Sequence, residues 1–181
     1  ADDLGVDHVS AYGEGTNPPP TPVIDGLAAQ GVLFRNVWAY PSCSPARAAI
    51  LTGRYPFRTT VGRWIRHPNN SGPAIGTIRG AEWTTPELLD LAGSGYAHAC
   101  IGKWHMHDAT LGPGAPITLG GYDTYTGGLR GQPVSYTSWQ RVFQGAEQTE
   151  TTYATTKTTD ETGSAHVRTP PTSPPRLPSA A

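Results

Sequence analysis

One proline-flanked stretch organises the chain, and it reads Pro41-Ser42-Cys43-Ser44-Pro45-Ala46-Arg47-Ala48-Ala49-Ile50-Leu51-Thr52-Gly53-Arg54-Tyr55-Pro56. Pro45 suits the first helical position, because its fixed φ matches a helix start and no N–H is needed there. Residues 46–51 are mostly good helix formers, and Gly53 can adopt the left-handed conformation that closes a helix. The stretch predicts a short buried helix with Cys43 at its amino-terminal end.

This predicted helix surrounds Cys43 with positive charge. Backbone N–H groups and the positive end of the helix dipole point toward the thiol. Arg47 follows one turn later and adds a guanidinium that can bind two oxygens of an anion at once. We therefore expect an anionic ligand at this site. A cysteine near an arginine, considered alone, is more often a small buried side chain beside a surface cation.

The spacing of Cys43, Pro45, Arg47, Thr52 and Gly53 resembles the signature of the formylglycine-dependent (type I) sulfatases, and these residues fill every fixed position of it. The resemblance implies that a formylglycine-generating or anaerobic maturation enzyme oxidises Cys43 to formylglycine. One oxygen of the hydrated aldehyde then attacks the sulfur of a sulfate ester and the alcohol leaves. The second hydroxyl then expels sulfate and regenerates the aldehyde. A thiol has no second hydroxyl with which to complete that cycle.

Two acids, Asp2 and Asp3, stand at the start of the sequence and are followed by Leu4-Gly5. Such a pair is usually solvated or caps a helix. In sulfatases an Asp-Asp-Leu-Gly sequence at a strand's carboxyl end binds calcium, whose preferred ligands are hard oxygens. The resemblance therefore implies a Ca²⁺ ion held by Asp2, Asp3 and the modified Cys43, with further family ligands downstream. The strand that precedes these acids in sulfatases is missing, so we expect the sequence to begin inside the domain.

A second motif, Gly102-Lys103-Trp104-His105, follows a predicted strand over residues 96–101. Side chains alternate along a strand, so Lys103 and His105 are expected on one side of its end. Alone, a Lys-x-His pair is usually a surface pair. Here it resembles the second sulfatase signature, which implies that Lys103 holds a sulfate oxygen and that His105 contacts the formylglycine or the ester oxygen.

The flanking sequence predicts helices and strands in alternation. A helix over residues 22–30, with Thr21 as cap and Gly31 as stop, should pack its apolar face on a sheet, and a strand should follow over 32–38. Thr84 caps another predicted helix, and residues 120–128 form a glycine-rich turn whose spacing fits no nucleotide-binding loop.

Between these elements, residues 57–79 predict a loop region. It is either an ordinary solvated loop or a source of substrate-binding cations, which would be drawn from Arg58, Arg63, Arg66, His67 and Arg79.

Together these elements predict an α/β fold with helices packed on a largely parallel central sheet, as in the alkaline-phosphatase-like superfamily that includes sulfatases, and incomplete at both ends. We expect a partial catalytic domain over residues 1–161. Residues 162–181 are rich in Thr, Pro, Ser and Ala, which predicts a disordered or frame-shifted tail.

Composition excludes several classes of function. The net charge of −1 gives no basic field for nucleic acid, two cysteines are too few for a disulfide framework, and no apolar run is long enough to span a bilayer. Because sulfatases are mostly exported, we expect a periplasmic or secreted full-length protein.

The predicted function is hydrolysis of a carbohydrate or other small-molecule sulfate ester. One alternative is a phosphonate or phosphate monoester hydrolase of the same fold. A second is a truncated, non-catalytic fragment.

Overall fold

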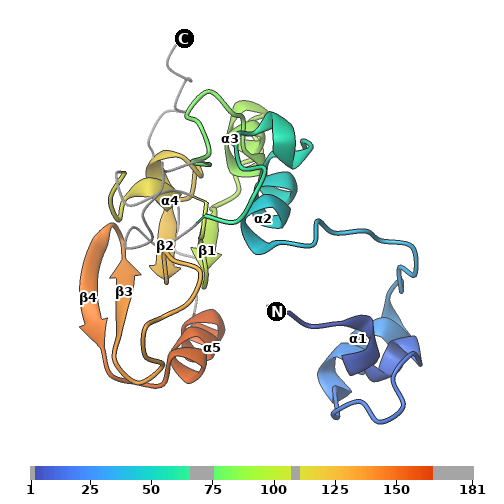
Figure 1. Ribbon diagram of the computed structural model, residues 1–181. Helices are drawn as coiled ribbons and strands as arrows, with labels where there is room; N and C mark the ends of the chain where they lie inside the picture. The colour runs from blue at the N-terminus through green and yellow to red at the C-terminus, as the bar shows by residue number, and fades with distance from the viewer. Residues whose placement is uncertain (1–2, 66–75, 107–110, 165–181) are drawn as a thin grey trace. The chain divides into compact units, whose positions relative to one another are not determined.

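The computed structural model describes residues 3–65, 76–106 and 111–164, and the chain divides into two compact units, Ala1–Ala39 and Tyr40–Ala181 (Figure 1). The predicted cations Arg66 and His67, the acid Asp2 and most of the predicted tail lie outside the described residues.

The first unit contains two short 3₁₀ helices, η1 (Val6–His8) and η2 (Ser10–Tyr12), and the helix α1 (Pro22–Gln30). The predicted helix is confirmed, with Pro22 in its first turn. Asp25 ties α1 to η2, because its carboxylate accepts hydrogen bonds from the backbone N–H of Ala11 (2.9 Å) and from the hydroxyl of Thr21 (3.1 Å). Local polar contacts therefore hold this unit together.

One prediction for the first unit is wrong. Residues 32–38 form no strand, because no described strand pairs with them, and the Phe34 carbonyl instead accepts a hydrogen bond from the Tyr12 hydroxyl. Within this unit no residue of α1 is buried, Val23 being 75% exposed and Leu27 67% exposed, and the packing of its apolar face on a sheet remains a prediction. Sequence periodicity identified the helix but not its partner.

The second unit begins with α2 (Cys43–Thr52), followed by η3 (Pro56–Arg58) and α3 (Thr85–Leu91). The predicted helix around Cys43 is confirmed, but it begins two residues before Pro45, which lies third rather than first in the helix. Gly53 closes α2 in the left-handed conformation with φ of 65°, as predicted.

The short helix α4 (Ala115–Thr118) and the longer α5 (Ala154–Ser164) complete the helices of the second unit. Helix α5 continues past Glu161, the last residue of the predicted domain. The limits of the domain and of its tail remain a prediction.

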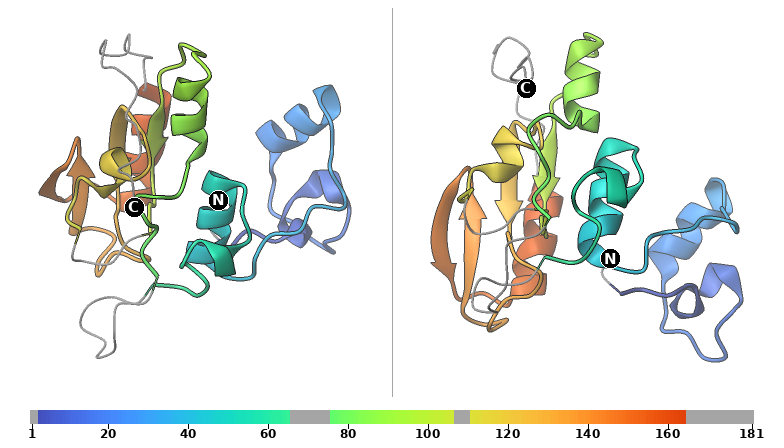
Figure 2. Two further views of the ribbon diagram at one scale, coloured as in Figure 1. Left: turned by 90° about the horizontal axis from the view of Figure 1, so that it is seen from above. Right: turned by 45° about the horizontal axis from the view of Figure 1, so that its top comes forward.

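Four strands form one mixed sheet in the order β1 (Ala99–Ile101), β2 (Thr124–Gly127), β3 (Trp139–Phe143) and β4 (Ala146–Glu150) (Figure 1). Strands β1 and β2 are parallel, whereas β2–β3 and β3–β4 are antiparallel. The α/β class is confirmed, and the described part of the sheet is mixed rather than largely parallel. Helix α5 lies beside β1 and β2 (Figure 2).

The core of the second unit lies between α2 and the sheet. Trp104 and Tyr125 are fully buried there, and Tyr122 contacts Trp104 edge-on with ring centroids 6.4 Å apart. The remaining buried members of this core are Ala48, Leu51, Val61, Ile65, Ile78, Met106, Leu129 and Val142. Burial of Ala48 and Leu51 in this core therefore holds one face of α2 in place.

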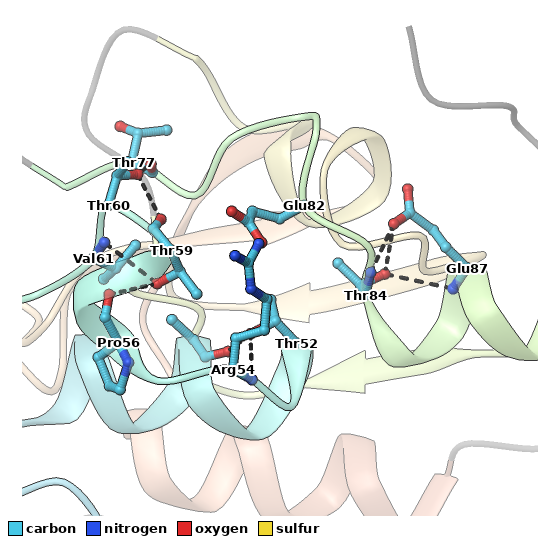
Figure 3. Close-up of polar contacts among 11 residues, drawn as sticks. Thr52, Arg54, Pro56, Thr59, Thr60, Val61, Thr77, Glu82, Thr84 and Glu87 are labelled. Atoms are coloured by element: carbon cyan, nitrogen blue, oxygen red, sulfur yellow. Dashed lines mark hydrogen bonds and ion pairs between the residues drawn. The ribbon is translucent and has the colours of Figure 1, made fainter. Parts of the chain in front are cut away.

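Polar contacts anchor the ends of α2 and α3 (Figure 3). The predicted Thr84 cap of α3 is confirmed, and Glu87 completes a reciprocal capping box with it. Just after α2, Arg54 forms an ion pair with Glu82 at 2.5 Å. Within the described residues, no helix combines the length and apolar character needed to cross a membrane.

Candidate active site

Cys43 is the first residue of α2, and Ser42 is its N-cap. The Ser42 side chain makes no capping hydrogen bond, so the backbone N–H groups at the helix N-terminus can bind a ligand at Cys43. Ser44 and Pro45 are buried, whereas Cys43 is partly exposed. The thiol therefore lies at the boundary between the core and the surface.

The structure brings His105 to Cys43 across 62 residues of sequence, with 3.2 Å between the thiol Sγ and the imidazole Nδ1. The other ring nitrogen, Nε2, lies 2.8 Å from the backbone carbonyl of Ile65. A carbonyl only accepts, so Nε2 carries the hydrogen and a neutral ring offers the Nδ1 lone pair to Cys43. This imidazole is only 4% exposed.

His105 reaches Cys43 by a backbone route that strand alternation does not predict. Strand β1 ends at Ile101, and the N–H groups of Trp104 and His105 then bond to the carbonyls of Gly128 and Leu129 at 2.9 Å each. His105 has a φ of 54°, a left-handed conformation that non-glycine residues rarely adopt. Lys103 and His105 therefore lie beyond the strand, and the side-chain alternation of a strand does not determine where they point.

Gly131 makes room for this imidazole. A Cβ at position 131 would lie 2.7 Å from Cε1 of His105, closer than side-chain atoms approach one another. Neither this glycine nor the Ile65 carbonyl is part of a motif that sequence reasoning identified. Both act on a residue distant in sequence, so no local signal identifies them.

Ser44 connects the start of α2 to the same segment. Its hydroxyl oxygen accepts a hydrogen bond of 3.1 Å from the backbone N–H of Ile65. Ser44 is fully buried, and Ile65 is 5% exposed. The four residues Cys43, Ser44, Ile65 and His105 therefore form a closed circuit of covalent and hydrogen bonds.

Arg47 lies one turn along α2, where its Nη1 donates a hydrogen bond to the backbone carbonyl of Lys103. The two predicted motifs are therefore in contact twice, through the side chains of Cys43 and His105 and through the Arg47 side chain and the Lys103 carbonyl. The sulfate-binding roles of Arg47 and Lys103 remain predictions.

A calcium site is not formed by the described residues alone. Among them, no group of three or more His, Cys, Asp or Glu side chains could hold a metal ion. Asp3 is exposed and belongs to the first unit, whereas Cys43 belongs to the second. The carboxylates of Asp2 and Asp3 are hard oxygen ligands of the kind that Ca²⁺ prefers, and their assignment to the ion remains a prediction.

Of the predicted loop cations that the structure describes, Arg79 lines a cavity of about 440 Å³. Ile78 in the same wall donates its backbone N–H to the carbonyl of Met106, the residue after His105. Leu111 and Leu119 supply apolar lining. The cavity wall is therefore connected by one hydrogen bond to the strand-end segment that carries His105.

Burial governs the titratable groups beneath the site. Desolvation raises the pKa of the Cys100 thiol from 9.0 to about 11, and the Arg47 charge opposes the shift. Desolvation, with a smaller contribution from Cys100, raises the pKa of Tyr122 to about 12, and burial also raises the pKa of Tyr125. Cys100 packs against the core.

A buried polar network supports the strand ends from the side of α5. Glu161 accepts a hydrogen bond of 2.7 Å from the Thr126 hydroxyl and forms an ion pair with Arg141. The Thr126 carbonyl in turn accepts from the N–H of Gly102 at 2.8 Å, next to Lys103.

Comparison with curated proteins shows sequence similarity to sulfatases. The chain is 42% identical over 109 residues to N-acetylgalactosamine-6-sulfatase of Sus scrofa, an alignment that covers 58% of this chain and 20% of that protein. It is 41% identical over 110 residues to steryl-sulfatase of Homo sapiens, covering 59% and 18%. The chain thus spans about a fifth of the length of the curated relatives it matches.

Solved structures agree in fold. A sulfatase of Bacteroides fragilis superposes with a TM-score of 0.61 at 21% identity, covering 81% of this chain and 34% of that one. The PsFucS1 sulfatase from Pseudoalteromonas gives a TM-score of 0.58 at 25% identity, covering 80% and 32%. A family model described as Sulfatase matches residues 1–166. The chain therefore belongs to the sulfatase family.

Proposed function

We propose that this protein hydrolyses sulfate esters through a formylglycine formed from Cys43. The observation that carries the proposal is the contact of 3.2 Å between Cys43 Sγ and His105 Nδ1 at the N-terminus of α2. The sulfur stands where an oxygen of the hydrated aldehyde would lie. Family membership supports the chemistry, and the curated relatives bear the names of carbohydrate and steroid sulfatases.

His105 is suited to move a proton at position 43. With its Nε2 hydrogen donated to the Ile65 carbonyl, its Nδ1 lone pair can take a proton from the group at residue 43. The α2 N-terminus and the guanidinium of Arg47 would stabilise the negative charge that develops on a sulfate group. Lys103, whose backbone Arg47 contacts, adds an ammonium to the same segment.

Calcium would add to this positive field. An ion bound by Asp2, Asp3 and the modified residue 43 would supply a divalent charge that favours the anionic nucleophile. The remaining roles belong to the chain itself: Arg47 and Lys103 bind and orient sulfate oxygens, and His105 holds the proton.

The test begins with the 181-residue chain produced together with a formylglycine-generating enzyme. Mass spectrometry of the peptide containing residues 42–47 should find the lighter aldehyde, and the aldehyde-bearing chain should hydrolyse an aryl sulfate. Cys43→Ala should abolish turnover, whereas Cys100→Ala, a change at the other cysteine, should retain it. Turnover by a chain with an unaltered Cys43 thiol contradicts the proposal.

Relative rates separate the alternatives. Faster hydrolysis of an aryl phosphonate than of the matched aryl sulfate would identify a phosphonate hydrolase of the same fold. A fully converted chain that hydrolyses neither ester would identify a non-catalytic part of a longer enzyme. Calcium titration supplies an independent readout, because a ligand that binds only the folded state raises the melting temperature.

A further inference from the structure

We propose that Ser44 is a positioning residue for His105, acting through the backbone of Ile65 to fix which ring nitrogen faces residue 43. This inference rests on the proposed function and assigns a role to the residue between the two signature positions Cys43 and Pro45. Ser44 contacts neither the thiol nor the imidazole in the hydrogen bonds described above. It acts through the segment between them.

The first step is the bond between Ser44 and Ile65. The Ser44 hydroxyl oxygen accepts the Ile65 N–H at 3.1 Å, and both residues are nearly or fully buried. A buried N–H that loses its acceptor is costly, so this bond determines where the Ile65 main chain lies. The Ile65 side chain is held separately in the core.

The second step is the bond between Ile65 and His105. The carbonyl of Ile65 lies across its Cα from the anchored N–H and accepts the Nε2 hydrogen at 2.8 Å. This contact selects the tautomer with its hydrogen on Nε2 and leaves the Nδ1 lone pair directed at Cys43. Displacement of the carbonyl would allow the hydrogen to move to Nδ1, which cannot then accept a proton.

The third step explains why His105 needs an external anchor. Its backbone has a φ of 54°, and its ring lies against Gly131, which has no side chain. A residue in a rarely populated conformation persists because surrounding contacts over-determine it. The anchored Ile65 carbonyl is one of these contacts.

The test compares Ser44→Ala with Ser42→Ala, the same change at the serine on the other side of Cys43. Ser42 is the N-cap, but its side chain makes no capping bond, so its loss should leave His105 unaffected. Nitrogen-15 NMR of the unmodified 181-residue chain reports the His105 tautomer, with the signal assigned by its absence in His105→Gln. We expect one Nε2–H tautomer in the parent and in Ser42→Ala, and a mixture in Ser44→Ala.

Activity gives the second readout, expressed per mole of aldehyde measured by peptide mass spectrometry. In Ser44→Ala we expect kcat to fall between about tenfold and about a hundredfold, with KM within about twofold, because Ser44 does not touch substrate. Ser42→Ala should match the parent. An Ser44→Ala protein with a single Nε2–H tautomer and the parent kcat overturns the inference.

A shape-matched pair keeps the inference testable where Ser44→Ala fails to fold. Ser44→Thr retains the hydroxyl, whereas Ser44→Val has nearly the same shape without it. We expect Thr to restore the tautomer and Val to lose it, and equal behaviour of the two overturns the inference. The NMR measurement needs no turnover, so a parent chain inactive on sulfate esters contradicts the proposed function while the role of Ser44 is still decided.

Discussion

Helices α1 and α2 begin and end with similar sequence signals, yet only α2 is built into a core. Both contain a proline in the first turn and are followed by glycine. In α2 the side chains of Ala48 and Leu51 are buried, whereas in α1 no residue is buried and Leu27 is 67% exposed. Local signals are therefore sufficient to place a helix, but burial depends on a distant partner.

Truncation of a leucine in each helix provides the largest expected contrast. Leu51→Ala removes a side chain that is 5% exposed and should lower the free energy of unfolding by about 2 to 5 kcal/mol. Leu27→Ala, the matched change in α1, should cost less than about 0.5 kcal/mol because its site is already solvated. Urea denaturation followed by tryptophan fluorescence measures both. Equal losses would show that Leu27 is buried in solution to the same extent as Leu51.

The same contrast explains how far the sequence could predict the fold. Capping residues located α1, α2 and α3, since their signals lie within a few residues of each helix end. The hairpin β3–β4 was missed, although Gln144-Gly145 forms a two-residue turn with φ of 49° and 81°, which is typical of a tight hairpin. That signal was present locally. No local signal showed that residues 32–38 form no strand, because a strand depends on a partner elsewhere in the chain.

The candidate site likewise combines residues that local sequence predicts with a contact that it does not predict. Cys43, Arg47, Lys103 and His105 were predicted from two motifs, and the structure places Cys43 against His105 and Arg47 against the Lys103 carbonyl. The Ile65 carbonyl was not predicted, because a backbone atom acts independently of its residue's identity. Contacts over long sequence distances complete the site, and the motifs alone do not contain them.

Buried titratable groups in the second unit lead to a prediction at alkaline pH. The pKa of Cys100 rises from 9.0 to about 11 because folding desolvates the thiol. A raised folded-state pKa favours the protonated form, so its stabilisation is complete below pH 9.0 and is lost as pH rises through about 11. The loss should be on the order of 2 kcal/mol.

Cys100→Ala isolates that contribution. In the variant, the free energy of unfolding should fall less steeply between pH 9.0 and about 11 than in the parent, under reducing conditions. A slope should remain, since desolvation also raises the pKa of Tyr122 to about 12. Measurements below pH 9.0 record the cost of the smaller side chain alone. Parallel pH profiles for parent and variant would exclude Cys100 as a source of the alkaline slope.

The smallest expected contrast compares the two threonines at helix starts. Thr84 caps α3 through its hydroxyl, which accepts from the Glu87 N–H at 3.4 Å, whereas the Thr21 side chain makes no capping bond to α1. Thr84→Ala should therefore cost about 1 kcal/mol in urea denaturation followed by circular dichroism, and Thr21→Ala less than that. Thr84→Ser retains the hydroxyl and should recover most of the loss. If Thr84→Ser is as unstable as Thr84→Ala, the methyl group packed at this fully buried position, rather than the cap, stabilises α3, because serine retains every polar contact of Thr84 and lacks only that methyl.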